Sequence, residues 1–273
     1  AWSKLGSTVT IVEATSGLLP AMDPRLGRTV RRRLKDLGVE VLTESLAIRM
    51  DAGHLVVASA TDRSTERTLE CDVVVVAVGR NPNVSDLGVE RYGPKVSDSG
   101  HIVVDPQRRA APHIYAIGDV TDGPALAHKA TAEAEVAADA VAGLPAAFDP
   151  AAIPEVVFCD PEVVSVGYSP GTAKDADIAT NTFRFPFIAG SRSRTIGDTA
   201  GFVQLVADES GTIIGAQAAG HGVSELSGEL ALAIEMGATA FDLAETIHAH
   251  PTMSEAIAEA ALGLDGRPLH VTN

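Results

Sequence analysis

The order of apolar segments near the start of the chain restricts its fold more than any other feature. Residues 9–12 and 39–43 are short apolar runs of strand character, and between them leucine and valine recur at helical spacing over 24–37. A further strand is expected at 55–60. Residues 72–78 are mostly valine, which is typical of a strand buried on both faces. Strand, helix and strand in this order predict a parallel α/β layer.

The middle of the chain contains shorter segments. Two strands are expected at 101–104 and 113–118, followed by an alanine-rich helix from about 128 to 141. Gly143 and a proline close behind it end that helix. Residues 146–153 form the best candidate for a linker between domains.

After this linker the pattern changes, because strands follow one another with no helices expected between them. They are predicted at about 155–158, 162–167, 182–187, 201–207 and 212–218. Three helices come afterwards, near 223–236, 240–247 and 252–262. Strands first and helices second predict an α+β domain with an antiparallel sheet.

The charge balance excludes one large class of partner. The net charge is −15, whereas nucleic acid binding needs a basic face, so no nucleic acid partner is expected. No stretch resembles a signal peptide or approaches the roughly 18–20 apolar residues of a membrane span, so we expect no membrane and a cytoplasmic location. Cys71 and Cys159 form no CxxC pattern, so they predict packed thiols and neither a redox disulfide nor a metal site.

Glu13 directly follows the first predicted strand. In dinucleotide-binding folds, an acid at the end of the second strand binds the ribose hydroxyls of NAD, although strand-end acids are also common as turn residues. The glycine fingerprint of such a fold should lie about 20 residues earlier. Only twelve residues precede Glu13. We therefore expect the first strand and phosphate loop of the layer, and with them a longer N-terminal part, to lie outside this chain.

Two stretches resemble signature sequences of the pyridine nucleotide–disulfide oxidoreductases. They read Val-Gly-Arg-Asn-Pro at 78–82 and His-Ile-Tyr-Ala-Ile-Gly-Asp-Val at 113–120. In that family the first stretch, which includes Gly79, returns the chain to the FAD domain. The second stretch places an aspartate, here Asp119, on the ribityl chain of the flavin. The alternative is that Asp119 is an ordinary turn residue that binds no flavin.

The residues after this aspartate resemble the family's turn towards the flavin ring. By that resemblance Ala125, Leu126, Ala127 and His128 present backbone N–H groups to the isoalloxazine, with the His128 side chain secondary. The helix that begins near Leu126 would direct its positive end towards the reduced flavin.

The sequence His-Ala-His-Pro-Thr-Met-Ser-Glu at 248–255 is the most informative stretch. It is similar to the His–Glu dyad of the family, and most similar to that of the dihydrolipoamide dehydrogenases. The resemblance implies that His250 is the acid–base catalyst and that Glu255 orients it. Read alone, residues 252–255 also form a capping box, in which Glu255 would only close a helix start. His248 is expected to be structural.

The resemblance implies a fold of three parts and a reaction. The parts are a partial NAD-binding domain at 1–79, the C-terminal part of an FAD-binding domain at 80–150 and a dimerisation domain at 151–273. The complete enzyme would use FAD, NAD and a disulfide outside this chain to reoxidise dihydrolipoyl groups, as a homodimer that serves the lipoyl domain of a 2-oxo acid dehydrogenase complex. Two alternatives stay open: an inactive dimerisation and partial nucleotide-binding fragment, or a related NAD(P)H–disulfide reductase.

Overall fold

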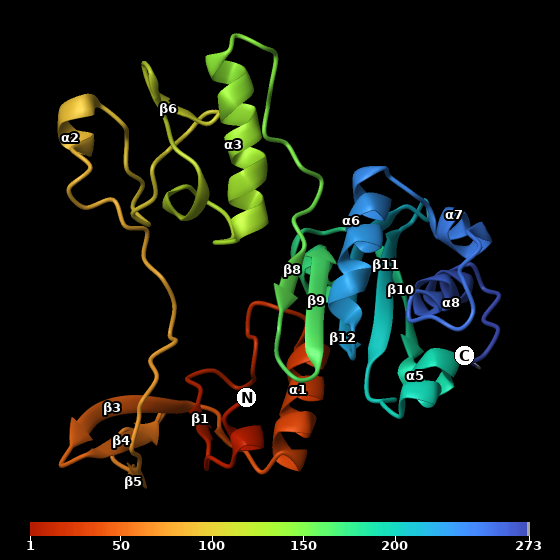
Figure 1. The fold of residues 1–273 in the computed structure, drawn as a ribbon, viewed down its shortest axis with the longest axis horizontal. Helices are drawn as coiled ribbons and strands as arrows, with labels where there is room; N and C mark the ends of the chain where they lie inside the picture. The colour runs from red at the N-terminus through yellow and green to blue at the C-terminus, as the bar shows by residue number, and fades with distance from the viewer. Residues whose placement is uncertain (272–273) are drawn as a thin grey trace. The chain divides into compact units, whose positions relative to one another are not determined.

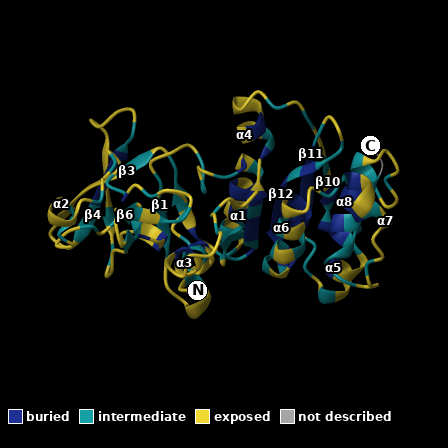
Figure 2. Cartoon of the chain, turned by 90° about the horizontal axis from the view of Figure 1, so that it is seen from above, coloured by how far each residue is buried: buried dark blue, intermediate teal, exposed yellow. Residues whose placement is uncertain are grey.

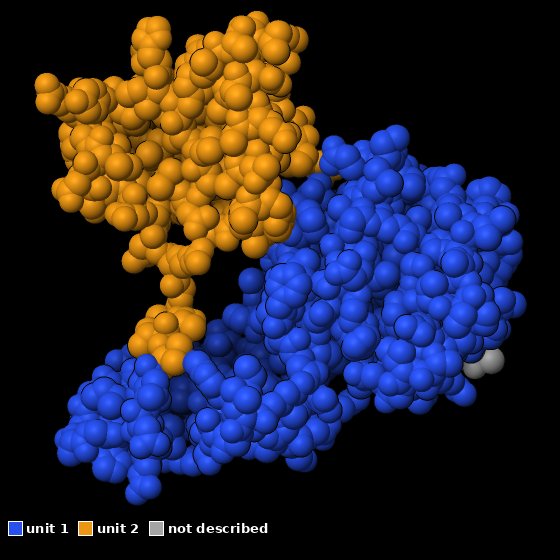
Figure 3. All heavy atoms as spheres, viewed as in Figure 1, with its two compact units in different colours: residues 1–74, 152–273 blue, residues 75–151 orange. Residues whose placement is uncertain are grey.

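A computed structural model describes residues 1–271 and divides the chain into two compact units. Unit 1 combines residues 1–74 with 152–273, and unit 2 comprises residues 75–151 (Figure 3). No helix within residues 1–271 is long and apolar enough to cross a membrane.

The parallel layer of unit 1 is small. Strands β1 (Thr10–Val12) and β2 (Glu40–Leu42) pair in parallel, and α1 (Pro24–Asp36) connects them, as the sequence predicted. Pro24 stands at the first turn of α1, and the Asp23 carboxylate accepts a hydrogen bond from the Arg25 N–H at 2.7 Å.

An antiparallel meander follows, of which only the middle strand was predicted. Strands β3 (Ser45–Asp51), β4 (His54–Ser59) and β5 (Glu66–Glu70) pair in that order. Most residues of the outer two are exposed, with charged side chains prevailing in β5 and apolar ones such as Ile48 and Met50 exposed in β3, so neither strand shows a buried apolar alternation in the sequence.

The strand predicted at 72–78 is wrong. These residues follow β5 without forming a strand, and Val76 and Val78 are 76% and 90% exposed. A strand buried on both faces needs hydrogen-bonded neighbours at its edges. Within residues 1–271 the parallel sheet consists of β1 and β2 alone, so this run has no strand beside it.

The second sheet of unit 1 is antiparallel, as predicted. Its order is β10-β11-β12-β9-β8, from β8 (Glu155–Val157), β9 (Glu162–Gly167), β10 (Thr180–Pro186), β11 (Phe202–Asp208) and β12 (Ile213–Gly220). The three predicted helices are present as α6 (Ser227–Glu235), α7 (Ala240–Glu245) and α8 (Glu255–Leu264).

The expectation of no helices between these strands is wrong. Helix α4 (Pro170–Asp175) follows β9, and α5 (Ser191–Ile196) follows β10. Each is under two turns long, which is too short for an apolar period to show in the sequence. A capping box between Ser169 and Thr172 starts α4, so local hydrogen bonds rather than patterning define it.

Both faces of the antiparallel sheet are covered, as Figure 2 shows by the concentration of buried residues there. On one face, α6 lies against β9 and β12, and α8 lies against β10 and β11 (Figure 1). Leu26 and Val30 of α1 pack on the other face, against Val163 and Phe202. Because neighbouring strand residues point to opposite faces, β11 is almost completely buried.

Unit 2 contains α2 (Val89–Tyr92), the hairpin of β6 (Arg109–Ala111) and β7 (Ile114–Tyr115), and the predicted helix as α3 (Ala127–Val141). The predicted strand at 113–118 is thus reduced to two residues before a 3₁₀ turn at Gly118–Val120. The strand predicted at 101–104 is wrong, because only Ile102 forms a single bridge, to Val96.

Candidate functional site

The His250 and Glu255 side chains meet at the start of α8. His250 Nδ1 lies 2.8 Å from Glu255 Oε1, and the Thr252 N–H donates to Glu255 Oε2 at 2.8 Å. An ionised carboxylate only accepts hydrogen bonds, so Nδ1 carries the proton in this pair. When the ring is neutral, Nε2 is therefore the basic nitrogen, on a side chain that is 67% exposed.

Glu255 combines the two roles that the sequence left open. It accepts from the Thr252 N–H as a capping-box carboxylate does, but α8 begins at Glu255 itself and Ser254 provides no side-chain cap. Burial acts to raise the pKa of Glu255, while the Thr252 N–H and His250 lower it more, and the resulting pKa lies below the usual value. The carboxylate thus stays ionised and able to orient the imidazole.

His248 belongs to the packing of unit 1. Its side chain is only 7% exposed. Its Nε2 lies 2.7 Å from Glu229 Oε1, and its Nδ1 lies 2.8 Å from the Thr246 carbonyl oxygen. These contacts agree with the structural role predicted for this residue.

A second histidine–glutamate pair lies beside the first and was not predicted. His270 Nδ1 is 2.5 Å from Glu259 Oε1, and both pairs line one shallow depression of the surface. Glu259 Oε2 is buried without a hydrogen-bond partner. The signal in the sequence is the spacing of Glu255 and Glu259, which at i and i+4 places both on one face of α8.

In unit 2, the structure brings together the two signature stretches. Arg80 of the first stretch donates from Nη1 to Asp119 Oδ2 of the second at 2.8 Å. The Asp119 side chain is 51% exposed at the 3₁₀ turn. Gly118 has φ of 75° in this turn, a conformation that favours glycine. Gly79 also has a positive φ, at 133°, and a Cβ added there would meet no atom within 4 Å.

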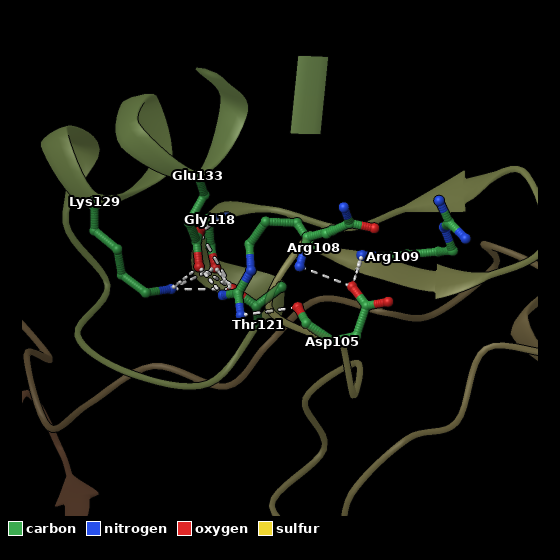
Figure 4. A network of polar contacts seen from close by, with 8 residues as sticks. Asp105, Arg108, Arg109, Gly118, Thr121, Lys129 and Glu133 are labelled. Carbon is green, nitrogen blue, oxygen red and sulfur yellow. Dashed lines mark hydrogen bonds and ion pairs between the residues drawn. The ribbon is translucent and has the colours of Figure 1, made fainter. Parts of the chain in front are cut away.

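A buried polar network supports the turn that contains Gly118 and Asp119 (Figure 4). Glu133 of α3 is fully buried, accepts the Gly118 N–H at 2.6 Å and lies 3.1 Å from Thr121 Oγ1. Lys129 Nζ and Arg108 Nη1 contact the same carboxylate at 3.0 and 2.7 Å. The network fixes the backbone beside Asp119 and explains why a glutamate and a lysine stand in an alanine-rich helix.

The Glu133 carboxylate is ionised in this network. Burial alone acts to raise the pKa of Glu133, but the Gly118 N–H, Lys129 and Arg108 together hold it below its ordinary range. The sequence offered one signal for the pair, since Lys129 and Glu133 are spaced i and i+4.

The four residues 125–128 span the start of α3. Ala127 is the first helical residue, and Leu126 at the N-cap provides no side-chain hydrogen bond. The positive end of this long helix is therefore presented by backbone N–H groups.

Glu13 lies directly after β1, where the sequence placed it. Its Oε1 accepts from the Thr15 N–H at 2.7 Å and from Thr15 Oγ1 at 2.8 Å. The carboxylate is thus engaged as a turn residue. Glu13 forms hydrogen bonds with Thr15 and Leu42. These contacts do not bring it together with the His250–Glu255 pair.

The two cysteines are half-buried free thiols rather than fully buried ones. Burial raises the pKa of Cys159, with the Asp160 and Glu162 carboxylates acting in the same direction. The protonated thiol form of Cys159 is therefore favoured.

Comparison with known proteins identifies the family. The profile of the pyridine nucleotide-disulphide oxidoreductases matches residues 1–134, and that of their dimerisation domain matches residues 153–261. The chain belongs to the pyridine nucleotide-disulphide oxidoreductase family. Both profiles agree with the α/β and α+β parts of the fold.

Several curated members of this family are similar over almost the whole chain. A dihydrolipoyl dehydrogenase of Geobacillus stearothermophilus is 46% identical over 274 residues, and one of Haloferax volcanii is 43% identical over 277 residues. These matches cover 99% and 100% of this chain but 58% of each relative. The chain therefore spans less than two thirds of the length of these oxidoreductases.

Solved structures of the family show the same fold. LpdA from Mycobacterium tuberculosis superposes with a TM-score of 0.84 at 27% identity, over 96% of this chain and 57% of its own. The HOCl-induced flavoprotein disulfide reductase RclA from Escherichia coli gives a TM-score of 0.84 at 25% identity, over 95% of this chain and 60% of its own.

Proposed function

We propose that the complete protein containing this chain is an NAD-dependent, FAD-containing dihydrolipoamide dehydrogenase. The observation that carries the proposal is the His250–Glu255 pair, in which the carboxylate holds Nδ1–H at 2.8 Å and turns Nε2 outwards. The similarity to dihydrolipoyl dehydrogenases over 99% of the chain supports the choice of substrate. The redox disulfide is supplied by a part of the protein outside this chain.

His250 holds and moves the proton in the proposed reaction. Nε2 of the neutral ring takes the proton from a dihydrolipoyl thiol, which leaves the thiolate as the nucleophile. Glu255 stabilises the imidazolium that forms and prevents the ring from turning. An imidazole suits this step, because its usual pKa of about 6.5 lies near the operating pH.

The described residues fit both proposed cofactors. A ribityl chain is a row of hydroxyl groups, to which Asp119 offers a half-exposed carboxylate. Residues 125–128 at the start of α3 would present backbone N–H groups to the flavin. Glu13 offers an acceptor to a ribose hydroxyl at the end of β1 and would repel a 2′-phosphate. When bound, FAD accepts the electron pair of the thiols and NAD⁺ carries it away.

We further infer the assembly and the location. The three predicted domains, 1–79, 80–150 and 151–273, are proposed as the working division, with residues 151–273 forming a homodimer. The match of 153–261 to a dimerisation domain supports this assignment. The lipoyl domain of a 2-oxo acid dehydrogenase complex is the proposed partner, and the cytoplasm is the proposed location.

The test uses the purified complete protein with dihydrolipoamide and NAD⁺, and it follows the appearance of NADH. We expect a bound-flavin absorption spectrum, rapid NADH formation and little reaction with NADP⁺. Reduction of glutathione disulfide by NADPH in place of this activity would identify a related disulfide reductase instead. A colourless and inactive complete protein would support the alternative of a dimerisation protein without catalysis.

A second test concerns the NAD assignment of Glu13. Replacing Glu13 by alanine should raise the KM for NAD⁺ and reduce the preference over NADP⁺, because the acceptor for the ribose is lost. The KM for dihydrolipoamide should not change. An unchanged cofactor preference would assign Glu13 to the Thr15 turn alone.

A further inference from the structure

Unit 1 contains a cavity of about 340 Å³ on the face of the antiparallel sheet that α1 covers. This volume lies within the range of roughly 300–1,000 Å³ found for small-molecule sites. Arginines from two elements line the cavity, four from α1 and one from β10, namely Arg25, Arg28, Arg32, Arg33 and Arg184.

The charge of the cavity is opposite to that of the chain. The chain carries 36 acidic and 21 basic residues, whereas five arginines and only three aspartates, Asp36, Asp160 and Asp198, line the cavity. Six of the thirteen residues of α1 are arginine or lysine. The excess positive charge is therefore a local feature of α1 and its surroundings.

Two of the five arginines are already paired. Arg33 contacts both carboxylate oxygens of Asp160 at 3.2 Å, and Lys4 also contacts Asp160. Arg25 Nη1 lies 3.2 Å from Asp23 Oδ2. Arg25 and Arg33 therefore have a structural role at this face of the sheet.

The other three arginines have no such partner. Within residues 1–271, Arg28, Arg32 and Arg184 form no ion pair with a carboxylate, and the Arg184 guanidinium lies 5.6 Å above the ring of Phe202. Arg28 and Arg32 are spaced i and i+4 on α1, where like charges repel and destabilise a helix. Three unpaired guanidinium groups thus line one concave surface.

We propose that this cavity is a binding site for a polyphosphate anion, either free or as the tail of a nucleotide. Guanidinium groups match phosphate oxygens with two parallel hydrogen bonds each, which lysine cannot reproduce. A linked row of phosphates would relieve the repulsion between Arg28 and Arg32 while also reaching Arg184. The inference does not depend on the proposed function, because it involves none of the residues assigned to the thiol, FAD or NAD.

The ligand is small rather than macromolecular. The cavity is concave and flanked by Asp36 and Asp198, and the net charge of −15 repels an extended polyanion such as nucleic acid. A short anion that enters the cavity avoids most of this repulsion.

The experiment measures binding of inorganic tripolyphosphate to the complete protein by titration calorimetry at low salt. Wild type and four variants are compared: Arg28→Gln, Arg32→Gln, Arg32→Lys and Arg31→Gln. Arg31 is the matched control, because it belongs to α1 but does not line the cavity. We expect Arg28→Gln and Arg32→Gln each to weaken binding by about 10-fold or more, Arg32→Lys by less, and Arg31→Gln not measurably.

The second measurement is the Tm, which separates a loss of binding from a loss of folding in the variants. Tripolyphosphate should raise the Tm of wild type and Arg31→Gln, and this gain should be lost in Arg32→Gln. ATP that binds more tightly than tripolyphosphate, in an Arg32-dependent way, identifies a nucleotide as the ligand, and equal affinities identify the free anion. The proposal is overturned if tripolyphosphate does not bind, or if Arg31→Gln weakens binding as much as Arg32→Gln. Arg32-dependent binding of polyglutamate without binding of tripolyphosphate would overturn it as well.

Discussion

Replacing Glu133 by glutamine removes one charge from the network behind Asp119 while keeping the size and one acceptor of the side chain. The carboxylate is 0% exposed and Lys129 is 2% exposed, so solvent does not screen the pair. Breaking such a pair leaves an uncompensated buried charge, which costs about 3–5 kcal/mol. Lys129 keeps Thr121 Oγ1 at 3.0 Å as a partner, and glutamine can still accept from the Gly118 N–H, so we expect the lower end of this range.

Hydrogen exchange of the complete protein measures this effect locally. A loss of about 3 kcal/mol makes the turn at Gly118–Val120 and the first half of α3 open roughly 100-fold more often. Glu135→Gln on the exposed side of the same helix is the control and should leave exchange unchanged. Adding Lys129→Met to Glu133→Gln should recover part of the protection, because it removes the more deeply buried of the two charges, Lys129 and Arg108, that lose the carboxylate. Equal exchange in Glu133→Gln and Glu135→Gln would refute the reasoning.

Three further outcomes are expected. Because the pKa of Glu133 is depressed in the folded protein, its stabilisation is present above the ordinary value of about 4.3 and is lost as pH falls below it, so the Tm difference between wild type and Glu133→Gln should shrink on acidification. A difference that persists under strongly acidic conditions would contradict this assignment. Alanine at Gly118 or Gly143, with φ of 75° and 77°, should cost about 1–2 kcal/mol, and more at Gly118, where the new Cβ would meet a neighbour at 3.3 Å. Equal losses of Tm would show that this contact does not matter. His270→Ala should cost about 1–3 kcal/mol in a urea titration, because it leaves the buried Glu259 carboxylate without a partner. Adding Glu259→Leu should restore most of that loss, and no recovery would argue against a buried-charge penalty.

The sequence predicted those elements whose own pattern determines them. The helix at 24–36 and the five strands between 155 and 220 were placed correctly, because their apolar period continues over several residues. The run at 72–78 failed for a different reason, since its burial depends on neighbouring strands and not on its own composition. Short helices such as 170–175 begin at a local capping box, which periodicity does not report.

The same distinction applies to the site: a contact within one short segment was predicted, and a contact between distant segments was not. The resemblance at 248–255 predicted the contact between His250 and Glu255, since both residues lie within one short segment. The buried network around Glu133 was not predicted, because Arg108 joins it from 25 positions away in the sequence. Pairing over such a distance is a property of the folded chain. The cofactor roles of Glu13 and Asp119 stay predictions that the described contacts permit.

The central claim is that His250, oriented by Glu255, moves the proton of the dihydrolipoyl thiol. The most direct test is the rate of NAD⁺ reduction by dihydrolipoamide in a His250→Gln variant of the complete protein, beside NADH oxidation by an artificial one-electron acceptor that needs no thiol. We predict that the first rate falls by about 10²–10⁴-fold, as expected for loss of general acid–base catalysis, while the second stays near that of wild type. A variant that keeps normal dihydrolipoamide turnover would contradict the account.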